Sequence, residues 1–192
     1  MTGNDERSWR QDNWGIFEEL PGDLMMWVLI ASELLVFGAA LLAFLAVRAS
    51  DPSGFASGQA KLDQTAAAFN TIVLVTSGLF GGLAVDYRKQ GHRSRARWCL
   101  LAAALFGAVF LAVKGMEYAH KWEIGIGIET SDFFTFYYLT TGFHALHVVA
   151  GIIILGLVAW ADSERNMETG VSFWHMVDLV WVLLFPIIYV LR

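Results

Sequence analysis

The sequence predicts an all-α integral membrane protein that crosses the bilayer five times. Hydrophobic residues make up 56% of the 192 residues, and the mean hydropathy is +0.52. Charged residues make up only 16%, against roughly 25% in soluble domains. These charges gather in short stretches between long apolar runs. Because such a chain would expose a large apolar area to water, lipid is the solvent that fits it.

Five apolar runs are long enough to cross the hydrocarbon core, which takes roughly 20 helical residues. We expect helices because lipid cannot satisfy free backbone groups and the runs are too long for barrel strands. The expected helices span residues 24–47, 66–85, 98–118, 133–160 and 173–191. Residues 24–192 thus form the membrane domain, and residues 1–23 form a polar, acidic segment. That segment has no apolar signal-peptide core, so we expect the first span to act as the targeting signal.

Four links between the spans carry turn residues or charge, and we expect all of them to be loops. They are Asp51-Pro52-Ser53-Gly54, the basic stretch from Arg88 to Arg95, Gly125-Ile126-Gly127, and residues 162–170.

The basic residues also predict the orientation. The second link is rich in cations, namely Arg88, Lys89, Arg93, Arg95 and Arg97, whereas the third link combines Lys121 with several acidic residues. The positive-inside rule places the second link in the cytoplasm, which makes the N-terminus cytoplasmic and the C-terminus periplasmic. Arg88 and Lys89 are also candidates for contact with lipid headgroups or a partner. The net charge of −5 and one short basic cluster give no support for nucleic-acid binding.

Glu33 lies about ten residues into the first span, and a charge at membrane depth is expensive and usually functional. It is either a proton-exchanging or substrate-linked carboxylate, or a structural acid that is kept neutral or paired across helices. We favour the structural interpretation. We expect its partner to come from the fourth or fifth span, with His144 or His175 as the leading candidates.

Two histidine-containing pairs share a spacing of three residues: His144 with His147, and His175 with Asp178. Imidazole and carboxylate groups are good metal ligands, so a metal or haem site is one interpretation. A stronger motif such as HExxH is lacking, and we favour an interhelical hydrogen-bond network without metal or catalytic residues. The expected members of this network are Glu33, Asn70, His144, His147, His175, Asp178 and Trp181.

Other intramembrane residues have structural explanations. We expect Lys114, Glu117 and Tyr118 to snorkel to the interface and join an aromatic belt, where they could contact lipid or a partner. Gly78 and Gly82 form a small-residue face for close helix packing. Pro186 removes a backbone donor, which predicts a kink in the last span.

The sequence motifs do not support nucleophilic catalysis or nucleotide binding. The single cysteine, Cys99, cannot form a disulfide within one chain. The sequence contains no GxSxG motif, phosphate-binding loop or dinucleotide fingerprint.

Five short motifs resemble subunit III of haem–copper oxidases. They are Ser32-Glu33 with Phe37, Asn70-Thr71, Glu117-Tyr118, the run from Thr141 to Val148 with Gly151, and the run from Trp174 to Trp181 with Tyr189. The chain is most similar to the short five-helix branch of this family, which includes NorE, an accessory protein of nitric oxide reductase. Lys114, where the family often has glutamine, and Pro186 depart from the oxidase pattern, and two further N-terminal helices of the full-length oxidase subunit are lacking.

The resemblance implies a non-catalytic subunit without haem or copper of its own. Such a subunit packs beside a haem–copper catalytic subunit, either oxidase subunit I or the nitric oxide reductase large subunit, in the bacterial inner membrane. It binds phospholipid and supports sustained turnover and proton uptake. Glu33 falls on the family's carbodiimide-reactive glutamate. Two alternatives stay open: a haem- or metal-binding oxidoreductase that uses His144, His147 and His175, and a small proton or solute carrier centred on Glu33.

Overall fold

The structure is a computed structural model that describes residues 24–161 and 163–191. The predicted segment at residues 1–23 therefore lies outside the described residues. The elements, in chain order, are α3 (Leu24–Ser50), α4 (Pro52–Gln59), α5 (Gln64–Lys89), α6 (Arg93–Glu123), α7 (Asp132–Ala161), α8 (Glu164–Phe185) and η1 (Pro186–Val190).

Five of these helices are long and apolar enough to cross a membrane. Their spans are Met25–Ser50, Gln64–Lys89, Arg93–Glu123, Asp132–Ala161 and Glu164–Val190. This confirms the predicted all-α fold with five membrane-spanning helices, and the chain is a multi-pass membrane protein.

The helices run further than the apolar stretches that predicted them. The second link contains only residues 90–92 between helices, with Gly91 at a φ of 82°, and α8 begins at Glu164 instead of residue 173. The predicted loops at 88–95 and 162–170 are therefore mostly helical. Polar helix ends continue past the apolar core, and an ion pair of 2.9 Å between Lys89 Nζ and Glu168 Oε1 joins two of them.

The first link is also helical. Asp51 accepts a hydrogen bond from the backbone N–H of Gly54 at 3.0 Å, and Pro52 occupies the first turn of α4. A side-chain acceptor before the helix and a proline in its first turn both favour a helix start. The residues that we expected to break the chain therefore begin a short helix, which packs against α7.

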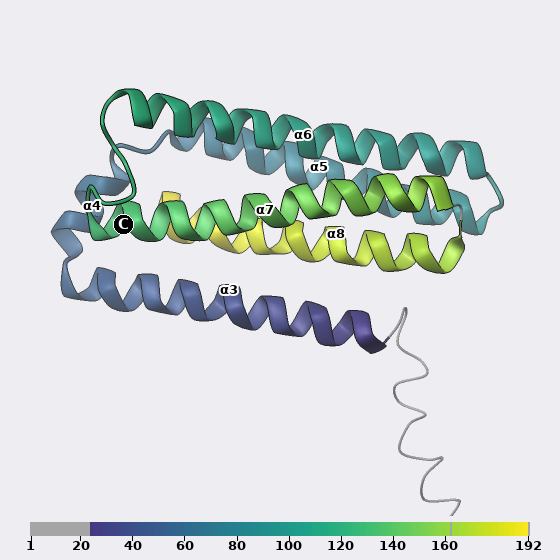
Figure 1. The fold of residues 1–192 in the computed structure, drawn as a ribbon, viewed down its shortest axis with the longest axis horizontal. Helices are drawn as coiled ribbons and strands as arrows, with labels where there is room; N and C mark the ends of the chain where they lie inside the picture. Colours follow the sequence, from purple (N-terminus) through teal and green to yellow (C-terminus); the bar gives the residue numbers. More distant parts are fainter. Residues whose placement is uncertain (1–23, 162, 192) are drawn as a thin grey trace, which may run out of the picture.

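Helices α5, α6, α7 and α8 lie side by side, each against the next, and α5 also packs against α8 (Figure 1). Helix α3 lies along one side of this group and contacts α7 and α8. It is the least buried of the five spans. The arrangement leaves α3 and the outer faces of α5 and α6 open to lipid or to partner proteins.

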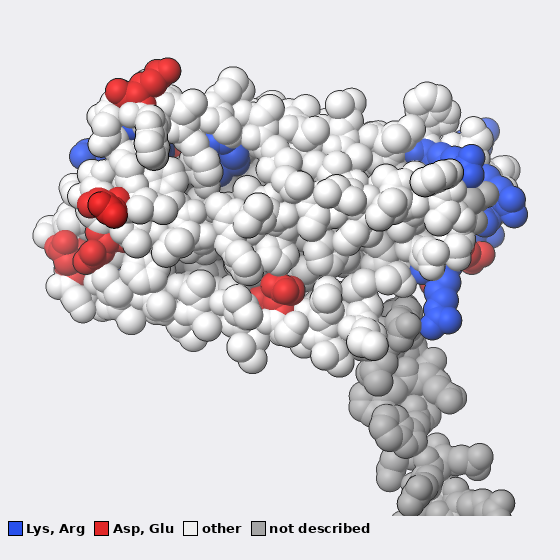
Figure 2. Space-filling model, viewed as in Figure 1, with Lys and Arg blue, Asp and Glu red and all other residues white. Residues whose placement is uncertain are grey.

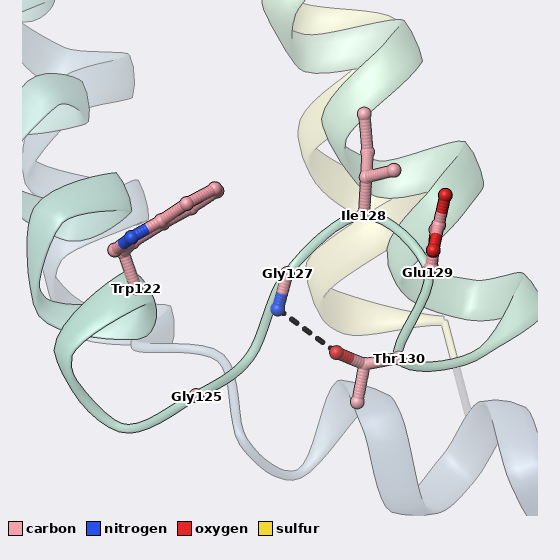
Figure 3. A pocket seen from close by; sticks show the side chains of 6 residues that line it. All are labelled: Trp122, Gly125, Gly127, Ile128, Glu129 and Thr130. Atoms are coloured by element: carbon pink, nitrogen blue, oxygen red, sulfur yellow. Dashed lines mark hydrogen bonds between the residues drawn. The ribbon is translucent and has the colours of Figure 1, made fainter.

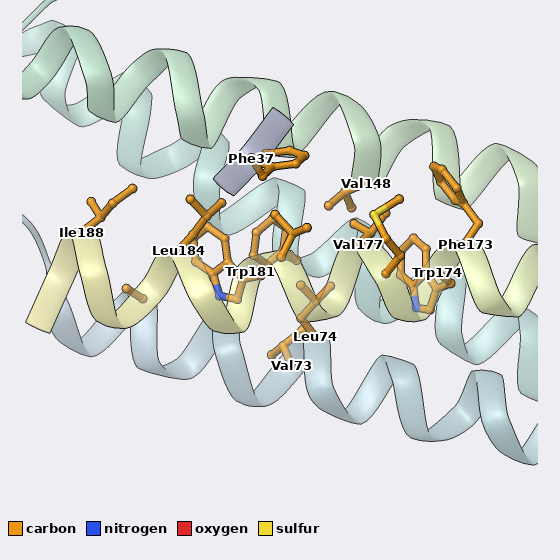
Figure 4. Packing of buried hydrophobic residues seen from close by; sticks show 14 of the residues in the cluster. Phe37, Val73, Leu74, Val148, Phe173, Trp174, Val177, Trp181, Leu184 and Ile188 are labelled. Carbon is orange, nitrogen blue, oxygen red and sulfur yellow. The ribbon is translucent and has the colours of Figure 1, made fainter. Parts of the chain in front are cut away.

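Helix α8 supplies the centre of the core, including Trp174 and Trp181 (Figure 4). The Trp174 ring fills the space beside Gly107 of α6 and Gly151 of α7, where a Cβ atom would come within 2.6 Å and 2.5 Å of ring carbons. Its Nε1 donates to the Ser77 hydroxyl at 3.1 Å. The small residues therefore create a slot in which the indole is both packed and hydrogen-bonded.

Pro186 ends α8, and the chain continues as one wide π-helical turn, η1. The sequence predicted a kink at Pro186, and the structure has a change from α-helical to π-helical geometry at this residue. Side chains from other elements donate hydrogen bonds to the carbonyls of this turn and of Leu191, which follows it. Gln59 Nε2 donates to Ile188 at 3.0 Å, Gln64 Nε2 donates to Tyr189 at 2.7 Å, and Arg48 donates to Leu191 at 2.7 Å.

Charge is distributed unevenly over the surface. In Figure 2, Lys and Arg side chains gather at the end of the bundle that holds the α5–α6 and α7–α8 connections. Acidic side chains dominate the opposite end, and the band between them carries almost no charge on this face. Such a band has the surface character of a bilayer-spanning protein.

Candidate functional site

A buried cluster around Lys114 is the most strongly connected polar group among the described residues. The Lys114 ammonium donates to Glu117 Oε2 at 2.9 Å, to the Tyr137 hydroxyl at 3.2 Å and to the Tyr189 hydroxyl at 2.6 Å. These partners account for all three N–H donors of a lysine. The Lys114 residue is only 2% exposed, so the ammonium is satisfied inside the protein.

Aromatic rings complete the surroundings of this ammonium. Its Nζ lies between 5.0 and 5.4 Å from the ring centres of Tyr118, Tyr137, Trp181 and Tyr189. The negative face of an aromatic ring attracts a cation, and this attraction is stronger where water is excluded. The rings therefore compensate part of the loss of hydration that burial imposes on Lys114.

Glu117 is the carboxylate of the cluster, and its side chain is 7% exposed. It accepts hydrogen bonds from the Tyr137 hydroxyl at 2.8 Å and from the Tyr189 hydroxyl at 3.3 Å. Lys121 Nζ lies 3.6 Å from Glu117 Oε1 and donates to the Lys61 carbonyl at 3.3 Å. Two buried lysines therefore share one carboxylate, and the tyrosine hydroxyls link α6 to α7 and η1.

This arrangement corrects the prediction that Lys114 and Glu117 snorkel to the interface. The side chains of Lys114 and Glu117 are 2% and 7% exposed, and the hydroxyl of Tyr118, a partly exposed residue, lies 2.5 Å from the Thr141 hydroxyl. The spacing of Lys114, Glu117 and Lys121 by three and four residues was a visible signal of a shared helix face. The prediction missed Tyr137 as a member of the cluster.

The intramembrane carboxylate Glu33 pairs with α7. The Glu33 Oε2 atom lies 3.1 Å from His147 Nε2, and His147 Nδ1 lies 2.9 Å from the Phe143 carbonyl. The side chains of Glu33 and His147 are 24% and 15% exposed. A polar partner from the fourth span is therefore confirmed, but the residue is His147 and the predicted choice of His144 or His175 is wrong.

His144 occupies an aromatic pocket instead. It is fully buried, its ring stacks on Trp181 with a centroid distance of 5.2 Å, and it meets the edge of Phe110 at 5.6 Å. Neither ring nitrogen has a hydrogen-bond partner among the described residues. The contacts of this histidine are thus those of a core aromatic residue.

Asn70 and Trp181 each make a separate interhelical hydrogen bond. Asn70 Nδ2 donates to the Phe110 carbonyl at 3.2 Å, and Trp181 Nε1 donates to the Thr71 hydroxyl at 3.0 Å. These bonds fix α5 against α6 and against α8. They do not connect with the pair formed by Glu33 and His147.

His175 and Asp178 lie on α8 and line a surface groove between α8 and α5. Asp178 is 8% exposed, and neither of its carboxylate oxygens has a hydrogen-bond partner among the described residues. Asp178 and His175 each face a glycine of α5. A Cβ on Gly78 would overlap the Asp178 carboxylate, and a Cβ on Gly82 would lie 3.9 Å from His175 Nε2. The glycine face predicted from the sequence is therefore the face that packs on α8.

The seven residues predicted as one network thus occupy several separate places in the bundle. Among the described members, a hydrogen bond joins Glu33 to His147, His144 stacks on Trp181, and His175 and Asp178 line the same groove, while Asn70 bonds to α6. Over residues 24–161 and 163–191, no group of three His, Cys, Asp or Glu side chains is arranged to hold a metal ion.

The remaining interface candidates lie at the basic end of α5. Lys89 is exposed and pairs with Glu168, and Arg88 is partly buried beside it. Both residues occupy the last turn of α5, where cations also complement the helix dipole.

An open pocket of about 620 Å³ lies in the link between α6 and α7 (Figure 3). Trp122, Ile128 and Glu129 line it, and the backbone N–H of Gly127 donates to the Thr130 hydroxyl at 2.8 Å. The polar side chains of its lining are the Glu129 carboxylate and the Thr130 hydroxyl, which accepts the hydrogen bond from Gly127.

Comparison with known proteins identifies the family. A family model described as cytochrome c oxidase subunit III matches residues 22–192. The chain is 32% identical over 176 residues to cytochrome c oxidase subunit 3 of Thermostichus vulcanus, covering 85% of this chain and 84% of that protein. It is 28% identical over 176 residues to cytochrome bo(3) ubiquinol oxidase subunit 3 of Pseudomonas putida, covering 88% and 84%. It is 29% identical over 198 residues to heme-copper oxidase subunit I+III of Aeropyrum pernix, covering 90% of this chain and 24% of that protein. The chain therefore belongs to the cytochrome c oxidase subunit III family.

Proposed function

We propose that this chain is the non-catalytic third subunit of a haem–copper terminal oxidase and packs beside the catalytic subunit in a bacterial inner membrane. The observation that carries the proposal is the family match over nearly the whole membrane domain, residues 22–192. The interior fits a structural subunit, because Lys114 and Lys121 both pair with Glu117 and the tyrosine hydroxyls join this cluster to α7 and η1.

The partner is suggested by a relative. The protein of Aeropyrum pernix is named as a fusion of subunits I and III, and this chain matches 24% of its length. Two units that are joined in one polypeptide are held close together in the membrane. We therefore propose oxidase subunit I as the partner, with haem and copper held by that subunit and none by this chain.

A nitric oxide reductase is the second candidate partner. Lys114 and Pro186 depart from the oxidase pattern and favour the short branch that includes NorE. The length of the chain does not decide between the two partners, because the match covers 84% of a protein named as an oxidase subunit.

The proposed role is structural. The bundle covers a lipid-facing surface of the catalytic subunit, holds phospholipid between the two proteins, and supports stability, sustained turnover and proton uptake. The basic end at Arg88 and Lys89 faces the cytoplasm in this proposal, which places both the N-terminus and the α7–α8 connection on that side.

Affinity purification of the tagged full chain in mild detergent, followed by mass spectrometry, tests the proposal. We expect recovery of a haem–copper catalytic subunit, and its identity separates the oxidase from the nitric oxide reductase. Recovery of the chain without either partner, together with unchanged oxidase and reductase activity after gene deletion, contradicts the proposal.

Two measurements on the purified chain address the remaining alternatives. A Soret band or stoichiometric metal that is lost on His147→Ala would indicate an autonomous redox protein. Proton or solute transport in liposomes that is lost on Glu33→Gln would indicate a carrier. The proposed accessory role predicts neither result.

A further inference from the structure

The groove between α5 and α8 has the features of a docking site for another transmembrane helix. Its volume is about 780 Å³, and its lining includes Gly78, His175 and Asp178 near the middle of the two spans. Its apolar walls include Leu79 and Leu179, which are 61% and 50% exposed.

Asp178 is the unusual member of this groove. It is more than nine-tenths buried, both carboxylate oxygens are without a partner among the described residues, and it lies near the midpoint of the span Glu164–Val190. Ionisable side chains at membrane depth almost always face a polar partner. Burying a carboxyl group without a hydrogen-bond partner is costly, and a donor from another chain would lower that cost.

The two glycines of α5 give the groove its shape. Gly78 and Gly82 are one helical turn apart, and a Cβ on Gly78 would overlap the Asp178 carboxylate. A Cβ on Gly78 would also lie 3.4 Å from His175 Nδ1. The glycines bring the backbone of α5 against the Asp178 carboxylate, whose oxygens are buried, while His175 is exposed in the groove. Small residues of this kind allow transmembrane helices to approach closely.

The pair formed by Glu33 and His147 provides an internal comparison. That carboxylate also lies within a span, but it has a partner 3.1 Å away on α7. The face formed by α3 and α7 therefore needs no external hydrogen-bond donor, whereas the face formed by α5 and α8 does.

We infer that a transmembrane helix of the catalytic subunit packs into the groove between α5 and α8 and directs a hydrogen-bond donor toward Asp178 and His175. This inference rests on the proposed function. Lipid tails carry no donor. A second copy of this chain, related by a two-fold axis, would place one Asp178 groove against another and bring two acidic groups together.

Site-specific photocrosslinking in native membranes tests the contact. The crosslinker is placed at Leu179 or Val182 on the groove, and at Leu146 or Ile153 on the exposed face of α7 as the matched control. We expect the groove positions, and not the α7 positions, to yield peptides of the catalytic subunit. Crosslinks from α7 alone, or from the groove only to lipid or to a second copy, overturn the inference.

Two bulky substitutions measure the effect on assembly. Leu179→Trp fills the groove, and Leu146→Trp adds the same bulk on α7. We expect recovery of the catalytic subunit to fall about tenfold with Leu179→Trp and to stay unchanged with Leu146→Trp, because packing drives helix association in membranes. Equal recovery with both variants overturns the inference, while loss of recovery with the unmodified chain contradicts the proposed function instead.

Asp178 itself distinguishes docking from a purely internal role. Asp178→Leu removes a polar group that has no internal partner, so we expect the isolated full chain to unfold at an unchanged or higher temperature. Recovery of the catalytic subunit should nevertheless fall, and Asp178→Asn, which keeps a hydrogen-bonding side chain, should recover most of it. A lower unfolding temperature together with unchanged recovery assigns Asp178 to internal packing and overturns the inference.

Discussion

Lys114 and Glu117 form an ion pair of 2.9 Å on one face of α6, and their side chains are only 2% and 7% exposed. Hydroxyl groups from α7 and η1 bond to both members of the pair. The pair is therefore a junction of three elements, and the predictions on stability begin with it.

Removing the ammonium alone should be severe. Lys114→Met leaves the Glu117 carboxylate buried beside two tyrosine hydroxyls, and breaking one member of a buried pair costs about 3–5 kcal/mol. Thermal unfolding of the detergent-solubilised chain measures the loss. Lys89→Gln serves as the control because Lys89 is exposed, and an exposed pair contributes at most about 1 kcal/mol. Similar losses of stability for Lys114→Met and Lys89→Gln would contradict the assignment of Lys114 to a buried ion pair.

Lys114→Gln should be milder than Lys114→Met. A glutamine amide keeps two N–H donors for the Glu117 carboxylate and the tyrosine hydroxyls, although it loses the charge. We expect an unfolding temperature between those of the unmodified chain and Lys114→Met. Equal unfolding temperatures for Lys114→Gln and Lys114→Met would mean that the hydrogen bonds of the glutamine side chain contribute little to stability.

The double variant Lys114→Met with Glu117→Leu should be more stable than the sum of the single losses implies. Each single variant leaves one member of this pair buried with fewer partners, whereas the double variant removes both members and leaves only Lys121 without its carboxylate. The free energies of unfolding of the four proteins give the coupling, which we expect to be about 1–3 kcal/mol. Strict additivity would show that the two groups act independently. Lys121 remains near the site in every variant, so the cycle reports only on the first pair.

Glu33→Gln should have a small effect on stability. Its side chain is 24% exposed and makes one side-chain hydrogen bond, to His147, and a glutamine can still bond to the imidazole. We expect a loss of about 1 kcal/mol, typical of one hydrogen bond. Chemical unfolding of the detergent-solubilised chain measures it, and Glu117→Gln provides the buried comparison. A larger loss for Glu33→Gln than for Glu117→Gln would contradict the expectation that the buried carboxylate contributes more to stability than the partly exposed one.

Two glycines on α7 should respond in opposite ways to alanine. At Gly151 a Cβ would lie 2.5 Å from the Trp174 ring, whereas at Gly156 nothing lies within 4 Å. We expect Gly151→Ala to lower stability by about 1–3 kcal/mol through overpacking. Gly156→Ala should raise it by about 0.5–1 kcal/mol through helix propensity. Thermal unfolding of both variants checks the contrast, and a gain at Gly151 would show that Trp174 moves freely.

Hydropathy predicted the fold because the bilayer restricts the solutions to helices of sufficient length. It did not predict the helix ends, since the residues that extend α8 back to Glu164 are polar and lie outside the apolar pattern. The short helix α4 was missed because Asp51 and Pro52 suit a loop and a helix start equally well.

The site was harder to predict because it depends on how each helix is rotated. His144 and His147 are three residues apart, which leaves them about 60° apart around the helix axis. Only the packing of α3 on α7 decides which imidazole meets Glu33. A lysine near a helix end can reach the interface or turn inward, and the tyrosines that hold Lys114 inside belong to segments remote in sequence.

The remoteness of those tyrosines bears on how the protein is made. Tyr189 lies 75 residues beyond Lys114 and Tyr137 lies 23 residues beyond it. When α6 leaves the ribosome, its lysines and glutamate therefore lack the hydroxyl groups that later surround them. We expect the nascent helix to stay in a protected environment, such as the insertion machinery, until the following helices arrive. The bundle would then assemble as a whole, without release of its helices one at a time.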